Sequence, residues 1–185
     1  LHANTVQLFS QWNYKINEQF SFNAGLHSLY LTNNNSFSLE PRASVKYELS
    51  EQQSFSMGYG LHSQMQPISV YEARVEQPDG TTVQPNKNLG FNKAQHFVLG
   101  YDRSLSRYLR IKAETYYQHL YNIAVRKDVN SPVSTLVLEQ GFETEPMVNK
   151  GLGRNYGAEL TLEQFMKNDL YFLLSFILRI SHILS

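Results

Sequence analysis

The segment from residue 39 to residue 62 constrains the fold most, because apolar and polar residues alternate along almost its whole length. Residues 39–49 read LEPRASVKYEL, residues 50–53 form a polar turn, and residues 54–62 read SFSMGYGLH. The apolar positions on the two sides of the turn are Ala43, Val45, Tyr47, Leu49, Phe55, Met57, Tyr59 and Leu61. A period of two places such residues on one face of a β-strand. The segment is therefore predicted to form a hairpin with one apolar and one polar face.

A single register sorts both faces of this hairpin, which makes the prediction locally consistent. The expected cross-strand pairs are Leu49 with Phe55, Tyr47 with Met57, Val45 with Tyr59, Lys46 with Gly58, and Arg42 with His62. The apolar face needs an apolar neighbour. A soluble β-sandwich would turn this face to its core, whereas an outer-membrane β-barrel would turn it to lipid.

The same alternation predicts six further strands, at residues 5–14, 20–31, 94–102, 108–121, 156–163 and 170 to about 176. The expected pairs are Tyr14 with Phe20, Trp12 with Phe22, Leu99 with Ile111 and Phe97 with Ala113, which would place His96 opposite Glu114. Short turns alternate with longer connections, of which 63–92 and 122–154 are the longest. Strands of about ten residues with loops sorted in this way are typical of a transmembrane β-barrel.

Composition supports this interpretation and excludes several classes of function. The chain has 185 residues, and its 16 basic and 16 acidic residues give no support for a nucleic-acid partner. It has no cysteine, which excludes disulfide scaffolds, cysteine-based zinc sites and cysteine nucleophiles. Aromatic residues at the predicted strand ends suggest two interfacial girdles: Tyr14, Phe20, Phe55, Tyr101 and Phe165 at one end, and Tyr30, Tyr116, Tyr117 and Tyr121 at the other.

Three pairs of titratable residues are candidates for chemistry: His96 with Glu114, Arg42 with His62, and Glu159 with Glu163. They could form a metal site or an acid–base pair. The favoured interpretation is the charged wall of a water-filled lumen, because no three-ligand cluster and no nucleophile–base pair can be assembled. We therefore predict no catalytic, cofactor-binding or metal-binding residues, and a protein that is not an enzyme. Lys150 and Arg154 near a rim could contact an anionic ligand or lipopolysaccharide, or they could simply be loop residues.

On the barrel interpretation, the apolar faces of the strands contact lipid. The residues predicted to face lipid are Val45, Tyr47, Phe55, Met57, Tyr59, Leu99, Ile111 and Leu160. Ligand contacts are expected in the long connections 63–92 and 122–153, because rim loops carry recognition in barrels.

Four stretches resemble the C-terminal barrel of TonB-dependent outer-membrane receptors, most closely those of Bacteroidetes-type bacteria. They are LEPRASVKYEL at 39–49, SFSMGYGLHSQMQP at 54–67, NKGLGRNYGAELTLEQ at 149–164 and DLYFLLSF at 169–176. The resemblance implies a barrel of about 22 strands closed by an N-terminal plug. It also implies the outer membrane of a Gram-negative bacterium as location, and active import of a scarce ligand such as a siderophore, vitamin, peptide or glycan.

The partners that the resemblance implies are outer-membrane lipid, the TonB complex through a plug domain that this sequence lacks, a surface lipoprotein and the imported ligand. We expect residues 1–176 to be a partial barrel of about eight antiparallel up-and-down strands, with short periplasmic turns and long extracellular loops. Residues 177–185, ILRISHILS, depart from the family pattern and suggest a truncated or frame-shifted product. An isolated arc would leave two open edges in lipid, so we expect the chain alone not to insert stably.

Two alternatives remain open at this stage. Eight strands are enough to close a small outer-membrane pore or structural barrel that is complete in itself. A soluble β-sandwich that binds carbohydrate would show the same alternation and would be recovered without detergent.

Overall fold

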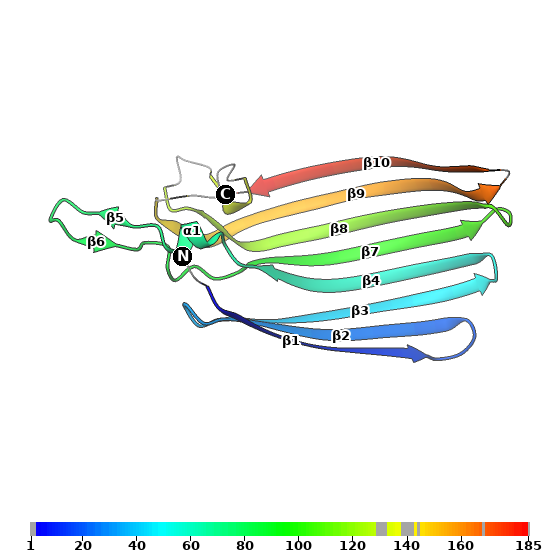
Figure 1. The fold of residues 1–185 in the computed structure, drawn as a ribbon, viewed down its shortest axis with the longest axis horizontal. Coiled ribbons are helices and arrows are strands. Elements are labelled where there is room, and N and C mark those ends of the chain that lie inside the picture. Colours follow the sequence, from blue (N-terminus) through cyan, green and yellow to red (C-terminus); the bar gives the residue numbers. More distant parts are fainter. Residues whose placement is uncertain (1–2, 129–132, 138–142, 144, 168, 185) are drawn as a thin grey trace.

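The eight predicted long strands form one antiparallel sheet (Figure 1). The computed structural model describes residues 3–128, 133–137, 143, 145–167 and 169–184. The strands follow one another across the sheet in chain order, apart from a small hairpin inserted between β4 and β7. They are β1 (Thr5–Lys15), β2 (Phe20–Leu31), β3 (Ser36–Ser50), β4 (Gln53–Gln64), β7 (Asn92–Ser104), β8 (Leu109–Arg126), β9 (Met147–Lys167) and β10 (Leu170–Leu184). This order confirms the predicted up-and-down topology.

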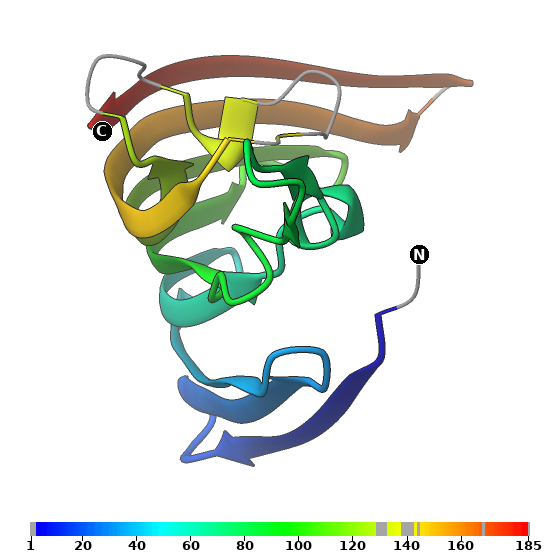
Figure 2. The same cartoon turned by 90° about the vertical axis from the view of Figure 1, so that its left-hand side faces the viewer.

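The sheet curves into an open arc, as the view along the strands shows (Figure 2). Strands β1 and β10 are its two edges and do not pair with each other in the described residues, so the sheet is not a closed eight-stranded barrel. The other described sheet has only two strands, β5 (Val75–Glu76) and β6 (Thr82–Val83). The chain therefore does not form the two-layer sandwich that was one alternative.

The registers of three hairpins differ from the predicted ones, each time by an even number of residues. In β3–β4, Tyr47 lies opposite Phe55 and Val45 opposite Met57. In β1–β2, Tyr14 lies opposite Phe22 rather than Phe20. An even shift keeps every side chain on its predicted face, so the alternation of the sequence cannot detect it.

The third register, between β7 and β8, is shifted by four residues and changes all three predicted pairs. Leu99 lies opposite Thr115, His96 opposite Gln118, and Glu114 opposite Gly100, so the prediction that His96 faces Glu114 is wrong. The predicted pair of Arg42 with His62 is also wrong, because Arg42 lies opposite Gly60.

Turn geometry sets these registers. In the first turn, the Asn17 side chain accepts hydrogen bonds from the backbone N–H groups of Gln19 and Phe20 (2.9 and 2.7 Å). In the β7–β8 turn, the backbone N–H of Leu105 donates to the carbonyl of Leu109 (2.8 Å). Both turns therefore close further along the chain than the alternation suggested.

The second long connection is shorter than predicted, because β8 continues to Arg126 and β9 begins at Met147. The register of the two strands shifts between Leu120 and Ile123, where Asn122 has a left-handed backbone conformation with a positive φ of 55°. Asparagine tolerates this conformation better than most residues. The glycines at 151 and 153 resemble a loop in sequence, but pairing with β8 makes them part of a strand, since tertiary context overrides intrinsic propensity.

Strand β10 runs to Leu184, beyond its expected end near Phe176. Its pairing with β9 continues through the segment that we interpreted as an atypical tail: Ile177 lies opposite Glu159, and Arg179 opposite Gly157. The origin of that segment as a truncated or frame-shifted product stays a prediction.

The long connections lie at one end of the strands, on the concave side of the arc (Figures 1 and 2). They contain α1 (Ile68–Tyr71), the β5–β6 hairpin and the short 3₁₀ helix η1 (Thr135–Val137). The buried core lies here. It consists of Leu29, Leu31, Val70, Tyr71, Leu89, Phe91, Ala124 and Met147. Among the described residues, no helix is both long enough and apolar enough to span a membrane.

Candidate functional site

The sheet register divides the strand side chains into two faces, because residues directly opposite each other on paired strands share a face. One face holds Leu29 and Leu31, which the long connections cover, so it is the concave face. All eight residues predicted to face lipid lie on the opposite, convex face. One row across it contains Val45, Met57 and Leu99, and the next contains Tyr47, Phe55, Tyr101, Ala113 and Leu160. Contact of these residues with lipid stays a prediction.

The convex face carries no acidic residue in the described part of the eight-stranded sheet. Every acidic residue within the described strands of this sheet lies on the concave face: Glu40, Glu48, Asp102, Glu114, Glu159 and Glu163. Large apolar side chains on the convex face are instead exposed, with Met57 at 60%. A carboxylate is costly in a hydrocarbon environment and inexpensive in water. The distribution therefore suits an apolar surrounding outside and water inside.

Aromatic rings pair across neighbouring strands on the convex face. Phe20 stacks on Tyr47 with ring centroids 4.5 Å apart, and Phe55 lies 4.9 Å from Tyr101. Such pairs contribute about 0.5–1.5 kcal/mol beyond the area that they bury. Tyr116, which was assigned to the second girdle, lies on the concave face instead, opposite Val98 and Gly157.

A buried carboxylate anchors the concave face beneath the long connections. Glu40 is 2% exposed, and its Oε2 lies 2.9 Å from His27 Nδ1 and 3.4 Å from Arg42 Nη2. Its Oε1 has no hydrogen-bond partner. His27 comes from β2, directly opposite Glu40 on β3. The Arg42 side chain is about half exposed, so its guanidinium contacts Glu40 on one side and is accessible to solvent on the other.

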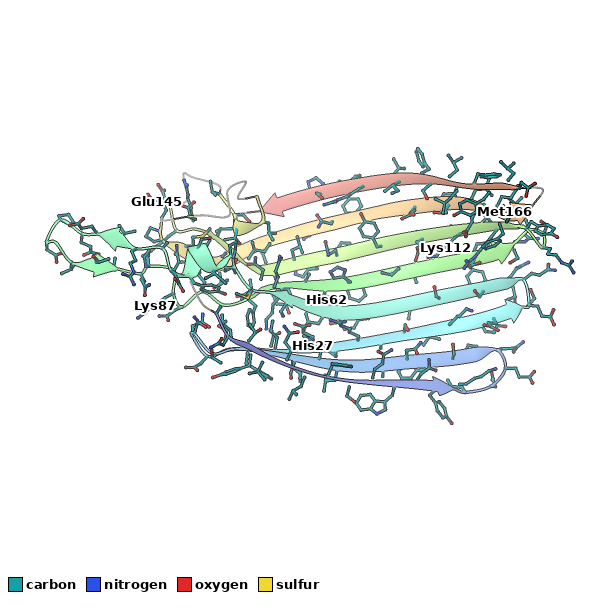
Figure 3. The ribbon with its side chains drawn as sticks, in the orientation of Figure 1. His27, His62, Lys87, Lys112, Glu145 and Met166 are labelled. Atoms are coloured by element: carbon teal, nitrogen blue, oxygen red, sulfur yellow. The ribbon has the colours of Figure 1, made fainter. Side chains whose placement is uncertain are left out.

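Two histidines and two amides continue this surface across the sheet (Figure 3 labels His27 and His62). The rings of His62 and His96 meet edge to face, with centroids 4.7 Å apart. Gln118 Nε2 lies 2.6 Å from His96 Nε2, and Asn155 donates to Gln118 Oε1 at 2.5 Å. The resulting row of polar side chains crosses from β4 to β9.

Nearer the short turns, the concave face carries ion pairs. Lys112 Nζ lies 2.7 Å from Glu114, and Arg110 pairs with Asp102. Glu159 and Glu163 share this face, as predicted, but they do not act as a pair: Glu159 lies opposite Glu114, and Glu163 opposite Arg110. These ion pairs are partly exposed. Their place in the wall of a water-filled lumen, which is the interpretation that the sequence favoured, stays a prediction.

A groove of ≈ 730 Å³ runs over β1–β4 and β7 on the concave face. Its polar lining includes Gln11, Asn23, Arg42, His62 and His96. Glycines 25, 58 and 60 leave its floor without side chains. The groove can offer hydrogen bonds and one guanidinium to a polar ligand. Its residues could hold such a ligand, but in the described part of the chain no group of three His, Cys, Asp or Glu could hold a metal ion.

The two long connections, which were expected to contact ligand, are joined by buried amides. Asn92 accepts from Gln66 Nε2 (2.9 Å) and from the backbone N–H of Ala124 (2.9 Å), and it donates to Thr135 (3.1 Å). Asn86 donates to the carbonyl of Glu145 (3.0 Å). These hydrogen bonds, which we call the amide network, link the two connections to each other. Part of the second connection lies outside the described residues.

A second pair of contacts strengthens this network. Asn149 accepts from the backbone N–H of Gly90 (2.8 Å) and donates to the carbonyl of Asn122 (2.9 Å). Sequence analysis did not single out these asparagines, because asparagine in a loop normally indicates a turn. The signal that could have found them is the recurrence of asparagine in NKNLGFN and VNKG, each at the C-terminal end of a long connection.

Two titratable groups of the first connection have pKa values that differ from their usual values. Hydrogen bonds from the hydroxyl and backbone N–H of Thr81 hold the pKa of the Asp79 carboxyl below its usual value. Burial raises the pKa of the Tyr71 phenol, whose oxygen accepts from the Gln66 N–H (3.3 Å). Both groups stabilise the local loop structure and neither suggests a reaction.

Comparisons with known proteins agree with this geometry. A family model described as "TonB dependent receptor-like, beta-barrel" matches residues 1–181. No curated protein matches the sequence.

Three solved structures share the fold at low sequence identity. The siderophore receptor PirA from Pseudomonas aeruginosa has 14% identity and a TM-score of 0.73, and the match covers 97% of this chain and 34% of that one. The ferric-catecholate import receptor Fiu from E. coli K12 has 13% identity and a TM-score of 0.72, over 99% and 28% of the two chains. The RagAB peptide importer has 14% identity and a TM-score of 0.70, over 97% and 22%.

The chain thus spans about a third or less of the length of each of these proteins. Its sheet is polar and charged on the concave face, has no acidic residue on the convex face of the described strands, and is connected by long segments at one end. Since the family model covers almost the whole chain, this protein belongs to the TonB-dependent receptor β-barrel family.

Proposed function

We propose that this chain forms part of the barrel wall of a receptor in the outer membrane of a Gram-negative bacterium, and that the receptor actively imports a scarce ligand. The observation that carries the proposal is the segregation of charge: the acids of the described sheet lie on the concave face, and the convex face has none. The role of the chain in this proposal is that of a wall, and we propose that it is not an enzyme.

The ligand and partners are inferred from the family. The structural neighbours are named for a siderophore, a ferric catecholate and a peptide, so we propose a siderophore, vitamin, peptide or glycan as cargo. The concave groove and the amide network are the surfaces that would contact it. The TonB complex would act through a plug domain, and a surface lipoprotein would cover the rim that carries the long connections, which we place outside the cell.

Cysteine labelling tests which face meets lipid. The sequence has no cysteine, so each substitution in this chain introduces a single thiol. Met57 and Ser56 are neighbours on β4 that lie on opposite faces. In whole outer membranes, we expect the Met57→Cys thiol to react with a lipid-soluble maleimide, and the Ser56→Cys thiol to react only with a small water-soluble one. The reverse pattern, or equal labelling by the water-soluble reagent, would contradict the proposal.

Growth tests the transport step. Deletion of the gene should abolish growth on limiting amounts of the cargo, tested across iron–siderophore complexes, cobalamin, peptides and glycans as single limiting sources. Loss of the TonB complex should have the same effect, and a plasmid copy of the gene should restore growth. Uptake that persists without the TonB complex would instead support a passive pore.

A further inference from the structure

Side chains that can donate hydrogen bonds to an anion gather around one glycine on the concave face. Gly60 on β4 lies directly opposite Arg42 on β3 and His96 on β7. His62 lies two residues further along β4 on the same face, and its ring meets that of His96 edge to face, with centroids 4.7 Å apart. All four residues line the concave groove. The arginine–histidine cluster is defined as Arg42, His62 and His96.

The missing side chain at Gly60 makes room for this cluster. A Cβ atom at this position would lie 2.9 Å from His62 Nε2 and 3.7 Å from Arg42 Cγ. The first distance is too short for a stable contact, so an alanine would push the imidazole away. Glycine inside a strand often marks a place where another group approaches closely. Gly60 therefore positions the His62 ring beside Arg42.

The cluster has hydrogen-bond donors to spare. A guanidinium has five N–H groups, and within the described residues that of Arg42 makes one hydrogen bond, to Glu40 at 3.4 Å. The His62 ring makes no hydrogen bond to any described residue. Both side chains line the groove, so these donors are available to a ligand there.

The neighbouring amides determine which nitrogen of His96 carries the proton. Asn155 donates to Gln118 Oε1 at 2.5 Å, which turns Gln118 Nε2 toward His96. His96 Nε2 is the nearer ring nitrogen, at 2.6 Å against 3.4 Å for Nδ1, and it accepts because an amide N–H can only donate. The proton of the neutral ring is then on Nδ1. His96 thus has a donor even when it is uncharged.

The local charge also favours an anion over a cation. The acid beside the cluster is Glu40, which is 2% exposed and is shared between Arg42 and His27. Its unpartnered Oε1 is buried and does not reach solvent. A cation in the groove would meet the Arg42 guanidinium, and among the described residues it would find no group of three His, Cys, Asp or Glu to hold it.

We propose that the arginine–histidine cluster binds a carboxylate or phosphate group of the imported ligand. This inference rests on the proposed function and narrows its cargo to anionic molecules. The planar fork of a guanidinium matches either oxyanion with two parallel hydrogen bonds. The two imidazoles would donate to the remaining oxygens. A neutral cargo would leave these donors without a charged acceptor.

Ligand-observed NMR on the whole receptor, purified in detergent from the outer membrane, tests the proposal. The probes are succinate, inorganic phosphate and succinamide, which is the neutral analogue of succinate. We expect succinate or phosphate to bind at least about tenfold more tightly than succinamide, because charge-assisted hydrogen bonds are stronger than neutral ones. The more tightly bound of the two anions identifies the preferred oxyanion.

Variants locate the binding in the cluster. Arg42→Gln should weaken binding of the anion about tenfold, and Arg42→Lys should weaken it less, because the charge is kept but the fork is lost. Gly60→Ala should weaken it about threefold by displacing the His62 ring, and His62→Gln should give a similar loss. Arg110→Gln is the matched control, because Arg110 lies on the same face near the short turns and pairs with Asp102. Its anion binding should be unchanged.

Three results would overturn the proposal: equal affinity for the anions and succinamide, wild-type affinity in the Arg42→Gln/His62→Gln double variant, or an equal loss in Arg110→Gln. A heat-modifiable band shows that each variant assembles. If Arg42→Gln does not assemble, Gly60→Ala and His62→Gln decide, because both keep the contact of Arg42 with Glu40. Failure of the proposed function is seen separately, since the Met57→Cys thiol would then react with water-soluble reagents whether or not the anion binds.

Discussion

The convex and concave faces of the sheet are built from alternate residues of the same eight strands, yet they differ in where their acidic and polar side chains lie. The convex face exposes aliphatic and aromatic side chains and has no acidic residue in the described sheet. The concave face carries ion pairs, histidines and amides. Because one backbone serves both, the difference lies in the side chains alone. Such a distribution suits a single sheet that separates two solvents, which is what the proposed function requires.

The concave face itself changes along the strands. At the end that carries the long connections it is covered, and Leu31 and Glu40 are 0% and 2% exposed. Toward the short turns it is open, and the side chains of Lys46 and Glu48 are about half exposed. Buried polar groups need partners, which the amide network supplies, whereas exposed charges can use water.

The largest expected effect comes from placing a charge on the wrong face. Leu99→Arg should lower the free energy of folding into membranes by about 2–4 kcal/mol if Leu99 lies near the midplane, and Tyr59→Arg or Ile111→Arg should act in the same direction. Urea titration of the receptor in lipid vesicles measures this quantity. Val98→Arg is the matched control, because Val98 is the neighbouring aliphatic residue on the concave face and lines the groove. Equal losses for Leu99→Arg and Val98→Arg would show that the two faces do not meet different solvents.

Disruption of the amide network should have the next largest effect. Asn92→Ala leaves Gln66 and the Ala124 N–H without their buried acceptor, which should cost about 1–3 kcal/mol. Faster amide hydrogen exchange in residues 65–91 would report it. Asn88→Ala is the control, because Asn88 is exposed and makes no side-chain hydrogen bond among the described residues. Unchanged exchange in Asn92→Ala would mean that the two connections are not held together by this network.

The aromatic pairs of the convex face should contribute less. A double-mutant cycle on Phe55→Leu and Tyr101→Leu should give a coupling energy of about 0.5–1.5 kcal/mol. The rings lie 4.9 Å apart on neighbouring strands. The pair Phe55 and Tyr117, two rows apart, should give additive losses. Coupling as strong in that control as in the contacting pair would show that the cycle measures a global effect and not the ring contact.

The smallest effect is expected at an exposed ion pair of the concave face. Lys46 Nζ lies 2.9 Å from Glu48, and both side chains are about half exposed, so Lys46→Gln should change the free energy of unfolding only slightly. The difference from the wild type should shrink in about 1 M salt, because salt screens exposed charges. A larger, salt-independent loss would place this pair in a dry environment and contradict the water-filled interior.

Much of the fold could be predicted from residue alternation. The eight strands, their order and the face of each predicted lipid-contacting residue could be predicted from a period of two in the sequence. This period can be read within one strand, without knowing which strand it pairs with. The candidate chemistry could not be predicted as well. The pairing of His96 with Glu114 failed because it depended on a register, and the register depended on where the β7–β8 turn closes.

The sequence by itself determined which side chains face outward and which face inward, because a shift by one residue would exchange the two faces and bury charge in an apolar surrounding. Only the tertiary structure decided which residues meet across the strands, because even shifts leave that pattern unchanged. It also decided that Asn86, Asn92 and Asn149 join the long connections, and that His119, Arg154 and His182 lie opposite one another on three neighbouring strands. These contacts join residues far apart in the chain, and local alternation carries no information about them.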